Sequence, residues 1–225
     1  IAWSKRRLLH YFYDSEVKAY LVILLSVFVL TFITLSIYLE DPGASLIQES
    51  AFQVVSIATT TGFLTANYSN WPLFVPILLL FTAFIGACAG STGGGIKVVR
   101  TLILAKQSAS EITKLIHPNA VISLKLGKKA VSPRVAESVW GFFSIYVIVF
   151  IFLFLFLLAQ GNDFITSFSA VGATLNNLGP GLGEVSNNYQ SLSDYSKLGL
   201  CMAMLLGRLE IFTLLVLFTP AFWKK

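Results

Sequence analysis

Two short strings of small and polar residues interrupt an otherwise apolar sequence, and their chemistry suits a cation. They are residues 59–63 (TTTGF) and residues 176–181 (NNLGPG). A dehydrated cation needs a ring of oxygen ligands, which backbone carbonyls can supply. Successive carbonyls point the same way only where some residue adopts an unusual φ, and glycine does so without a steric penalty. Gly62 and Gly179 are therefore the centres of two candidate carbonyl strands, and the hydroxyl of Thr60 can add an oxygen.

A third glycine-rich string, residues 86–97 (GACAGSTGGGIK), lies at the end of an apolar run. Each glycine costs about 1 kcal/mol of helix stability relative to alanine, so we predict that the helix breaks at Gly86 and continues as a flexible loop inside the membrane. The candidate gate residues in this loop are Gly86, Gly90, Ser91, Thr92, Gly93, Gly94, Gly95 and Lys97. The alternative is that small residues allow close helix packing, although three consecutive glycines fit that role poorly. A phosphate-binding loop is excluded, because Ile96 separates the glycines from the lysine and Val98 follows it.

Arg208 lies in the middle of the last apolar run. An arginine at mid-membrane costs from about 2.5 to over 10 kcal/mol, so it usually faces water or a partner. We predict that Arg208 projects into a pore below the two strands, where its charge raises the barrier to cations and its guanidinium can tether loop carbonyls. The alternative is a structural ion pair with Glu210 or with a carboxylate of another helix.

Composition indicates which elements must position these residues. Of the 225 residues, 56% are hydrophobic and 12% are charged, whereas soluble domains have about 25% charged residues. The two cysteines lie in apolar runs, which argues against a disulfide framework or a metal-ligand cluster. A membrane-spanning helix needs roughly 20 mostly apolar residues. Four runs qualify as spans: residues 19–39, a run from residue 71 past residue 85, residues 139–158 and residues 198–218.

Basic residues lie before the first run, between the second and third, and after the fourth, whereas the alternate segments carry acidic residues and a single lysine, Lys197. The positive-inside rule then puts both termini and the middle connector in the cytoplasm. Because the basic residues have this explanation, we expect no nucleic-acid partner, and the lipid membrane is the expected surrounding. The connector, residues 100–134, is predicted to form a basic helix that ends at His117 and Pro118.

The sequence contains one motif twice. A short segment of helical length precedes each string, residues 45–59 and residues 163–174, with Ser45 and either Asn162 or Asp163 as the expected N-caps. A Pro42-Gly43 turn precedes the first. Gly62 and Gly179 lie 117 positions apart, and aligning Asn67-Tyr68 with Asn188-Tyr189 places Gly86 opposite Gly207. An internal repeat of this kind is an architectural signal. The alternative for each string is an extracellular turn on an interfacial helix.

We therefore predict an all-α membrane fold of two span–pore helix–span repeats. The expected segments are a cytoplasmic N-terminal segment (residues 1–18), a first repeat with a broken second helix (19–99), the basic cytoplasmic connector (100–134) and a second repeat (135–225). Non-helical backbone at membrane depth is tolerated only where it is buried in protein or lines water. The two strings are thus expected to line a water-filled path.

Four motifs together resemble the Trk/Ktr/HKT superfamily of potassium transporters, and most of all the C-terminal half of its bacterial TrkH family. They are ATTTGF (58–63), GSTGGGIK (90–97), TLNNLGPG (174–181) and LLGRLEIFTLLVLF (205–218). The resemblance implies four repeats around one pore, of which this chain carries the third and fourth. It also implies that potassium binds the carbonyls of two filter strands and that the intramembrane loop is a gate. The implied filter residues are Thr60, Thr61, Gly62 and Phe63 in one strand, and Asn177, Leu178, Gly179 and Pro180 in the other.

Two strands cannot close a ring around an ion. The chain is therefore expected either to be a piece of a longer protein, whose upstream half carries the other two repeats, or to combine as two copies; the start at Ile1 without methionine favours the first. The resemblance further implies a homodimer, a cytosolic nucleotide-binding regulator like TrkA, and the bacterial inner membrane. No cofactor is expected in this chain, and K⁺ is the expected transported ion.

The function predicted from these features is gated, channel-like potassium uptake. The alternative is an ion-coupled secondary cation transporter driven by protons or sodium, for which Glu210 is the one candidate coupling carboxylate. A scaffold subunit without a pore is a third hypothesis, and the two filter-like strings argue against it. An enzyme is not expected, because the sequence has no visible nucleophile–base set.

Overall fold

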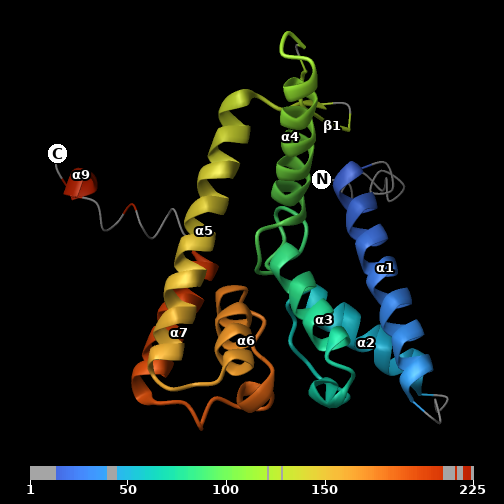
Figure 1. Cartoon of the computed structure of the whole chain (residues 1–225), viewed down its shortest axis with the longest axis vertical. Helices are drawn as coiled ribbons and strands as arrows, with labels where there is room; N and C mark the ends of the chain where they lie inside the picture. Colours follow the sequence, from blue (N-terminus) through green and yellow to red (C-terminus); the bar gives the residue numbers. More distant parts are fainter. Residues whose placement is uncertain are drawn as a thin grey trace, which may run out of the picture.

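The computed structural model describes residues 14–39, 45–120, 122–127, 129–209, 216 and 220–223. The predicted Pro42-Gly43 turn, Glu210, most of the N-terminal segment and most of the fourth run beyond Leu209 lie outside these ranges. The helices are α1 (Ser15–Tyr38), α2 (Leu46–Ala58), α3 (Phe74–Ile85), α4 (Val98–Ile116), α5 (Pro133–Ala159), α6 (Phe164–Leu175), α7 (Asp194–Arg208) and α9 (Pro220–Trp223) (Figure 1). Short 3₁₀ turns cover Tyr68–Asn70 and Gly183–Val185.

Two helices have the length and composition to cross a membrane, α1 with 24 residues and α5 with 27. Valine and leucine side chains on the outer face of α1, such as Val22 and Leu25, are 62% exposed, as expected of a surface that faces lipid. Of the four predicted spans, these two are continuous helices of spanning length within the described residues. The second run differs because α3 ends at Ile85, before the glycine where the sequence predicts a break. The helix of the fourth run, α7, is described only as far as Arg208.

The connector contains the helix α4 and a small hairpin. Strands β1 (Lys125–Leu126) and β2 (Lys129–Ala130) are antiparallel, with Lys125 opposite Ala130. The all-helical prediction did not include these strands. The ammonium of Lys106 donates a hydrogen bond of 2.6 Å to the carbonyl of Lys125, so the hairpin is fastened to α4.

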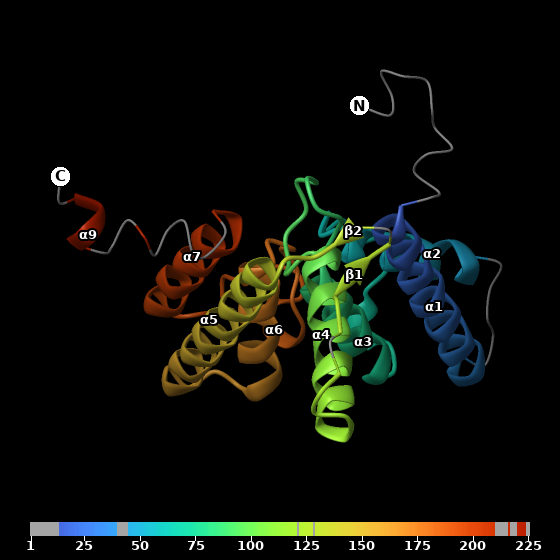
Figure 2. The ribbon, with the colours of Figure 1, turned by 90° about the horizontal axis from the view of Figure 1, so that it is seen from above.

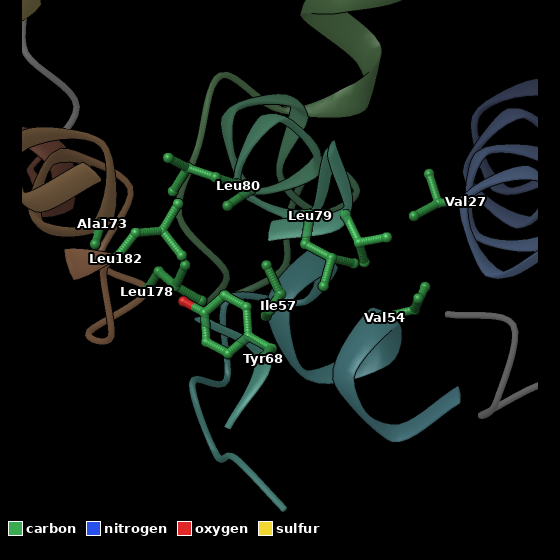
Figure 3. Close-up of a cluster of buried hydrophobic side chains, with 11 residues drawn as sticks. Val27, Val54, Ile57, Tyr68, Leu79, Leu80, Ala173, Leu178 and Leu182 are labelled. Atoms are coloured by element: carbon green, nitrogen blue, oxygen red, sulfur yellow. The ribbon is translucent and has the colours of Figure 1, made fainter. Parts of the chain in front are cut away.

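The two repeats form two bodies that meet at α3 and α6. In both views α1, α2 and α3 lie on one side, α5, α6 and α7 lie on the other, and α4 stands between them (Figures 1 and 2). The largest buried cluster draws on both repeats: it contains Ile57 and Leu79 from the first, and Ala173 and Leu178 from the second (Figure 3). The strings are thus held at a shared apolar core.

The short helices begin in different ways. Asp163 is the N-cap of α6, where its carboxylate accepts a hydrogen bond of 3.0 Å from the Thr166 amide. The alternative cap, Asn162, instead donates to the carbonyl of Leu157 at 2.8 Å. Ser45 precedes α2 but its backbone is already helical and its side chain makes no capping hydrogen bond. Ser45 thus stands at the predicted N-cap position of α2, without the side-chain hydrogen bond that Asp163 makes at α6.

Candidate cation site

Both strings begin with the same backbone turn. The first turn has hydrogen bonds from the Thr60 amide to Ile57 at 3.0 Å and from the Thr61 amide to Ser56 at 2.8 Å. The second has hydrogen bonds from the Asn177 amide to Thr174 at 3.0 Å and from the Leu178 amide to Ala173 at 2.8 Å. This pair of bonds is the Schellman arrangement that ends a helix with a left-handed residue. The two strings are therefore alike in conformation as well as in sequence position.

The left-handed residue in each string is not glycine. Thr60 has a φ of 54° and Asn177 a φ of 53°. Asparagine tolerates this region, but a β-branched residue there is a conformational outlier that costs of the order of 1–3 kcal/mol and must be held by its surroundings. Gly62 and Gly179, two positions further on, also have positive φ, at 79° and 105°. The unusual φ predicted for these glycines is thus present, and the residue two positions before each glycine also has a positive φ.

The side chains of these two left-handed residues bind structure outside their own string. The Thr60 hydroxyl accepts a hydrogen bond of 2.8 Å from the amide of Gly94 in the loop. The Asn177 amide group donates one of 3.3 Å to the carbonyl of Met204 in α7. The first string is therefore tied to the loop that follows the second apolar run, and the second string is tied to the helix of the fourth run.

The strings lie against each other. A Cβ placed on Gly62 would be 2.1 Å from the carbonyl oxygen of Leu178, a distance that no side chain can occupy. The eight predicted filter residues are therefore brought to one place in the fold, four from each string. Phe63 is 71% exposed, and its carbonyl accepts a hydrogen bond of 2.6 Å from the Ser56 hydroxyl. The Phe63 carbonyl is thus already bound by α2.

Three tyrosines outside the predicted site residues bind the second string. The hydroxyl of Tyr68 donates to the carbonyl of Gly181 at 2.8 Å, and that of Tyr189 donates to the carbonyl of Gly179 at 2.6 Å. The hydroxyl of Tyr146 donates to the side-chain oxygen of Asn176 at 2.7 Å. The repeated Asn-Tyr pairs at residues 67–68 and 188–189 were the available sequence signal for the first two.

The loop between α3 and α4 packs against both strings. A Cβ on Gly94 would lie 1.7 Å from the carbonyl oxygen of Asn176, and one on Gly93 would lie 3.3 Å from that of Thr59. Gly86, where the helix ends, has a φ of 72°. These glycines therefore allow a close approach of backbones in addition to bending the chain.

Two cationic side chains hold three successive carbonyls of the loop. Lys97 donates to the carbonyl oxygens of Ser91, at 2.9 Å, and of Gly93. Arg208 donates to the carbonyl oxygen of Thr92 at 2.7 Å. The tether from Arg208 to the loop is thus present, whereas Glu210, its alternative partner, lies outside the described residues. Lys97 is the last residue of the loop, and its ammonium binds carbonyls of the same loop.

The other end of the loop is fastened to α1. The amide of Ala89 donates a hydrogen bond of 2.5 Å to the carboxylate of Glu16. Beyond the loop lies a cavity of about 250 Å³, lined in part by Lys97, Arg100 and Arg208. The guanidinium of Arg100 lies 4.3 Å from the centre of the Phe142 ring. Lys97, Arg100 and Arg208 thus bring positive charge to this cavity beside the loop.

Comparisons with known proteins agree with the resemblance. The family model described as "TrkH: Cation transport protein" matches residues 3–225. The chain is 49% identical over 225 residues to the Trk system potassium uptake protein TrkH of Halomonas elongata, covering 100% of this chain and 47% of that protein. It is 50% identical over 223 residues to the TrkH of Escherichia coli, covering 99% of this chain and 46% of that protein. It is 41% identical over 213 residues to the TrkG of the same organism, with coverage of 94% and 44%.

A solved structure has the same fold. The crystal structure of the potassium transporter TrkH from Vibrio parahaemolyticus matches with a TM-score of 0.91 and 48% identity, and the match covers 100% of this chain and 48% of that one. The chain thus spans about half the length of the relatives that it matches. These relatives are named as transport proteins rather than enzymes.

Proposed function

Because the chain belongs to the TrkH family of cation transport proteins, we propose that it forms half the wall of a gated, channel-like pore for potassium uptake. One observation carries the proposal: two strings with the same left-handed turn lie side by side, and a glycine loop is tethered against both. The relatives named as potassium uptake proteins support K⁺ as the ion.

The filter in this proposal consists of carbonyl oxygens of the two strings. The C-terminal ends of α2 and α6 run directly into the strings. A helix C-terminus carries partial negative charge, so both helices favour a cation there. The strings contribute Thr60, Thr61, Gly62 and Phe63, and Asn177, Leu178, Gly179 and Pro180.

The gate in this proposal is the loop at residues 86–97. Lys97 binds carbonyls within the loop itself. Two ties hold the loop in the path, the Thr60 hydroxyl and the Arg208 guanidinium. Opening requires the loop to leave the strings, which breaks the hydrogen bonds to Thr60 and Arg208. The two cationic groups also raise the electrostatic barrier to any ion that has passed the filter.

Two strings do not surround an ion, so the pore needs further chain. We propose that the other strings come from an upstream half of the same protein, in line with the 47% of the Halomonas relative that this chain covers. The complete protein is proposed to work as a homodimer in the bacterial inner membrane with a cytosolic nucleotide-binding regulator like TrkA. The termini of this segment and the basic connector then face the cytoplasm, by the positive-inside rule.

The test is rubidium tracer uptake into potassium-loaded liposomes that contain the full-length protein, without a proton or sodium gradient. We expect uptake that follows the rubidium gradient and resists external sodium. Uptake that requires a proton or sodium gradient would instead establish the coupled transporter and overturn the channel-like proposal.

A further inference from the structure

Two tyrosines occupy matching places in the two repeats, and both bind the second string. Tyr68 and Tyr189 each follow an asparagine in the segment that leads from a string to the next helix. The Tyr189 hydroxyl binds the Gly179 carbonyl of its own repeat at 2.6 Å. The Tyr68 hydroxyl crosses between repeats and binds the Gly181 carbonyl at 2.8 Å. One tyrosine from each repeat therefore binds the second string.

The Tyr68 hydroxyl has little freedom to move. The side chain is 2% exposed and belongs to the apolar cluster that includes Ile57, Leu178 and Leu182. Figure 3 shows its ring among these residues, with the hydroxyl oxygen turned toward the second repeat. A hydroxyl fixed in this way sets the position of the carbonyl that it binds.

The first string is held by other groups. The Ser56 hydroxyl binds the Phe63 carbonyl at 2.6 Å, and the Gln53 amide group donates to the Ala66 carbonyl at 3.0 Å. Both residues belong to α2, the helix that precedes the string. The first string is thus fastened to its own helix. The second is fastened to its own helix through Asn176 and, in addition, to two tyrosines outside that helix.

We infer that Tyr68 and Tyr189 are positioning residues that set ion selectivity by keeping the carbonyls of the second string from closing in on a small cation. The inference rests on the proposed role of the strings as a filter. A carbonyl oxygen has two lone pairs, so Gly179 can accept the tyrosine hydroxyl and still face an ion. Sodium is smaller than potassium and needs its oxygen ligands closer. A tethered carbonyl cannot follow it inward, and a hydrogen-bond donor on that oxygen also weakens the field that it offers to the ion.

The inference is tested with tyrosine-to-phenylalanine variants of the full-length protein, which remove the hydroxyl and keep the ring. Tyr68→Phe, Tyr189→Phe and the double variant are compared with Tyr195→Phe, a matched control whose side chain on α7 is 72% exposed. Rubidium uptake into liposomes is measured at increasing external sodium. Since one hydrogen bond is worth a factor of roughly two to ten in an equilibrium, we expect the sodium concentration that halves uptake to fall at least about threefold in Tyr68→Phe and in Tyr189→Phe. Tyr195→Phe should match the unmodified protein.

Failure of the tyrosine inference can be distinguished from failure of the proposed potassium uptake. Unchanged sodium sensitivity in both variants, with normal rubidium uptake, overturns the inference and leaves the proposed function standing. Lower uptake with unchanged sodium sensitivity assigns the tyrosines a structural role only and also overturns it. If Tyr68→Phe does not fold, Tyr189→Phe, at a half-buried residue, provides the test by itself. Absence of passive rubidium uptake by the folded, unmodified protein would defeat the proposed function itself.

Discussion

Removal of the Arg208 side chain should raise potassium flux. Its guanidinium donates a hydrogen bond of 2.7 Å to the Thr92 carbonyl, and Arg208→Ala deletes that bond together with a positive charge below the strings. A hydrogen bond to a charged group contributes about 1.5–3 kcal/mol. Because Arg208 is exposed, the lower end applies, and about 1.5 kcal/mol corresponds to about a tenfold shift of the loop toward its released position. The Thr60 hydroxyl still binds the Gly94 amide of the loop, so we expect a partial release.

The assay is the initial rate of rubidium uptake by the full-length protein in potassium-loaded liposomes, with the melting temperature measured on the same samples. Arg208→Lys keeps the charge but not the forked geometry and should lie between the unmodified protein and Arg208→Ala. Arg134→Ala, which removes an exposed arginine at the start of α5, is the matched control and should leave the rate unchanged. An unchanged rate in Arg208→Ala with a lower melting temperature would refute the gating role and favour a structural ion pair.

Three further predictions concern other contacts of the site. Gly94→Ala should raise basal rubidium flux and lower the melting temperature, because the new Cβ would lie 1.7 Å from a carbonyl of the second string. Gly90→Ala in the same loop, where nothing lies within 4 Å of the new Cβ, should raise the flux less, even though Gly90 has a positive φ. Thr60→Val should raise basal flux because it leaves the Gly94 amide without its acceptor, whereas Thr60→Ser should keep the flux low; equal flux in the two variants would contradict the tether. Asp163→Ala should destabilise the protein by about 1 kcal/mol at neutral pH through loss of the α6 N-cap, and Asp163→Asn should largely preserve it. Burial raises the pKa of Asp163, but hydrogen bonds from Thr166 and from backbone amides outweigh burial, and the pKa is lowered. The difference in melting temperature between Asp163→Ala and the unmodified protein should therefore be fully present above the ordinary pKa of an aspartate. It should shrink as the pH falls through the lowered pKa.

The sequence predicted the features that depend on local composition. Long apolar runs predicted α1 and α5, and the density of glycines predicted that the second helix ends at Gly86. The period of the repeat predicted that Gly62 and Gly179 adopt related conformations. In each of these cases the physical cause lies within a few neighbouring residues.

The contacts that close the site could not be read from the sequence. Thr60 adopts a left-handed conformation that its residue type disfavours, because the distant Gly94 amide and the helix end over-determine it. The tyrosine hydroxyls have no local pattern that indicates which carbonyl they bind, since Tyr68 reaches a partner 113 positions away. Ser45 has the residue type and the position of a cap, yet its side chain makes no capping hydrogen bond.

The bond between Tyr68 and Gly181 can form only after both repeats have been synthesised. The first repeat leaves the ribosome before the second, so the hydroxyl at the centre of its apolar cluster waits for a partner 113 positions downstream. At about 5–20 residues per second, that interval lasts roughly 6 to 23 s for these 113 positions. During this time the core around Ile57 and Leu79 lacks its second-repeat members, Ala173, Leu178 and Leu182. The first repeat therefore has an unfinished apolar face during this interval, and the arrival of the second string completes the core.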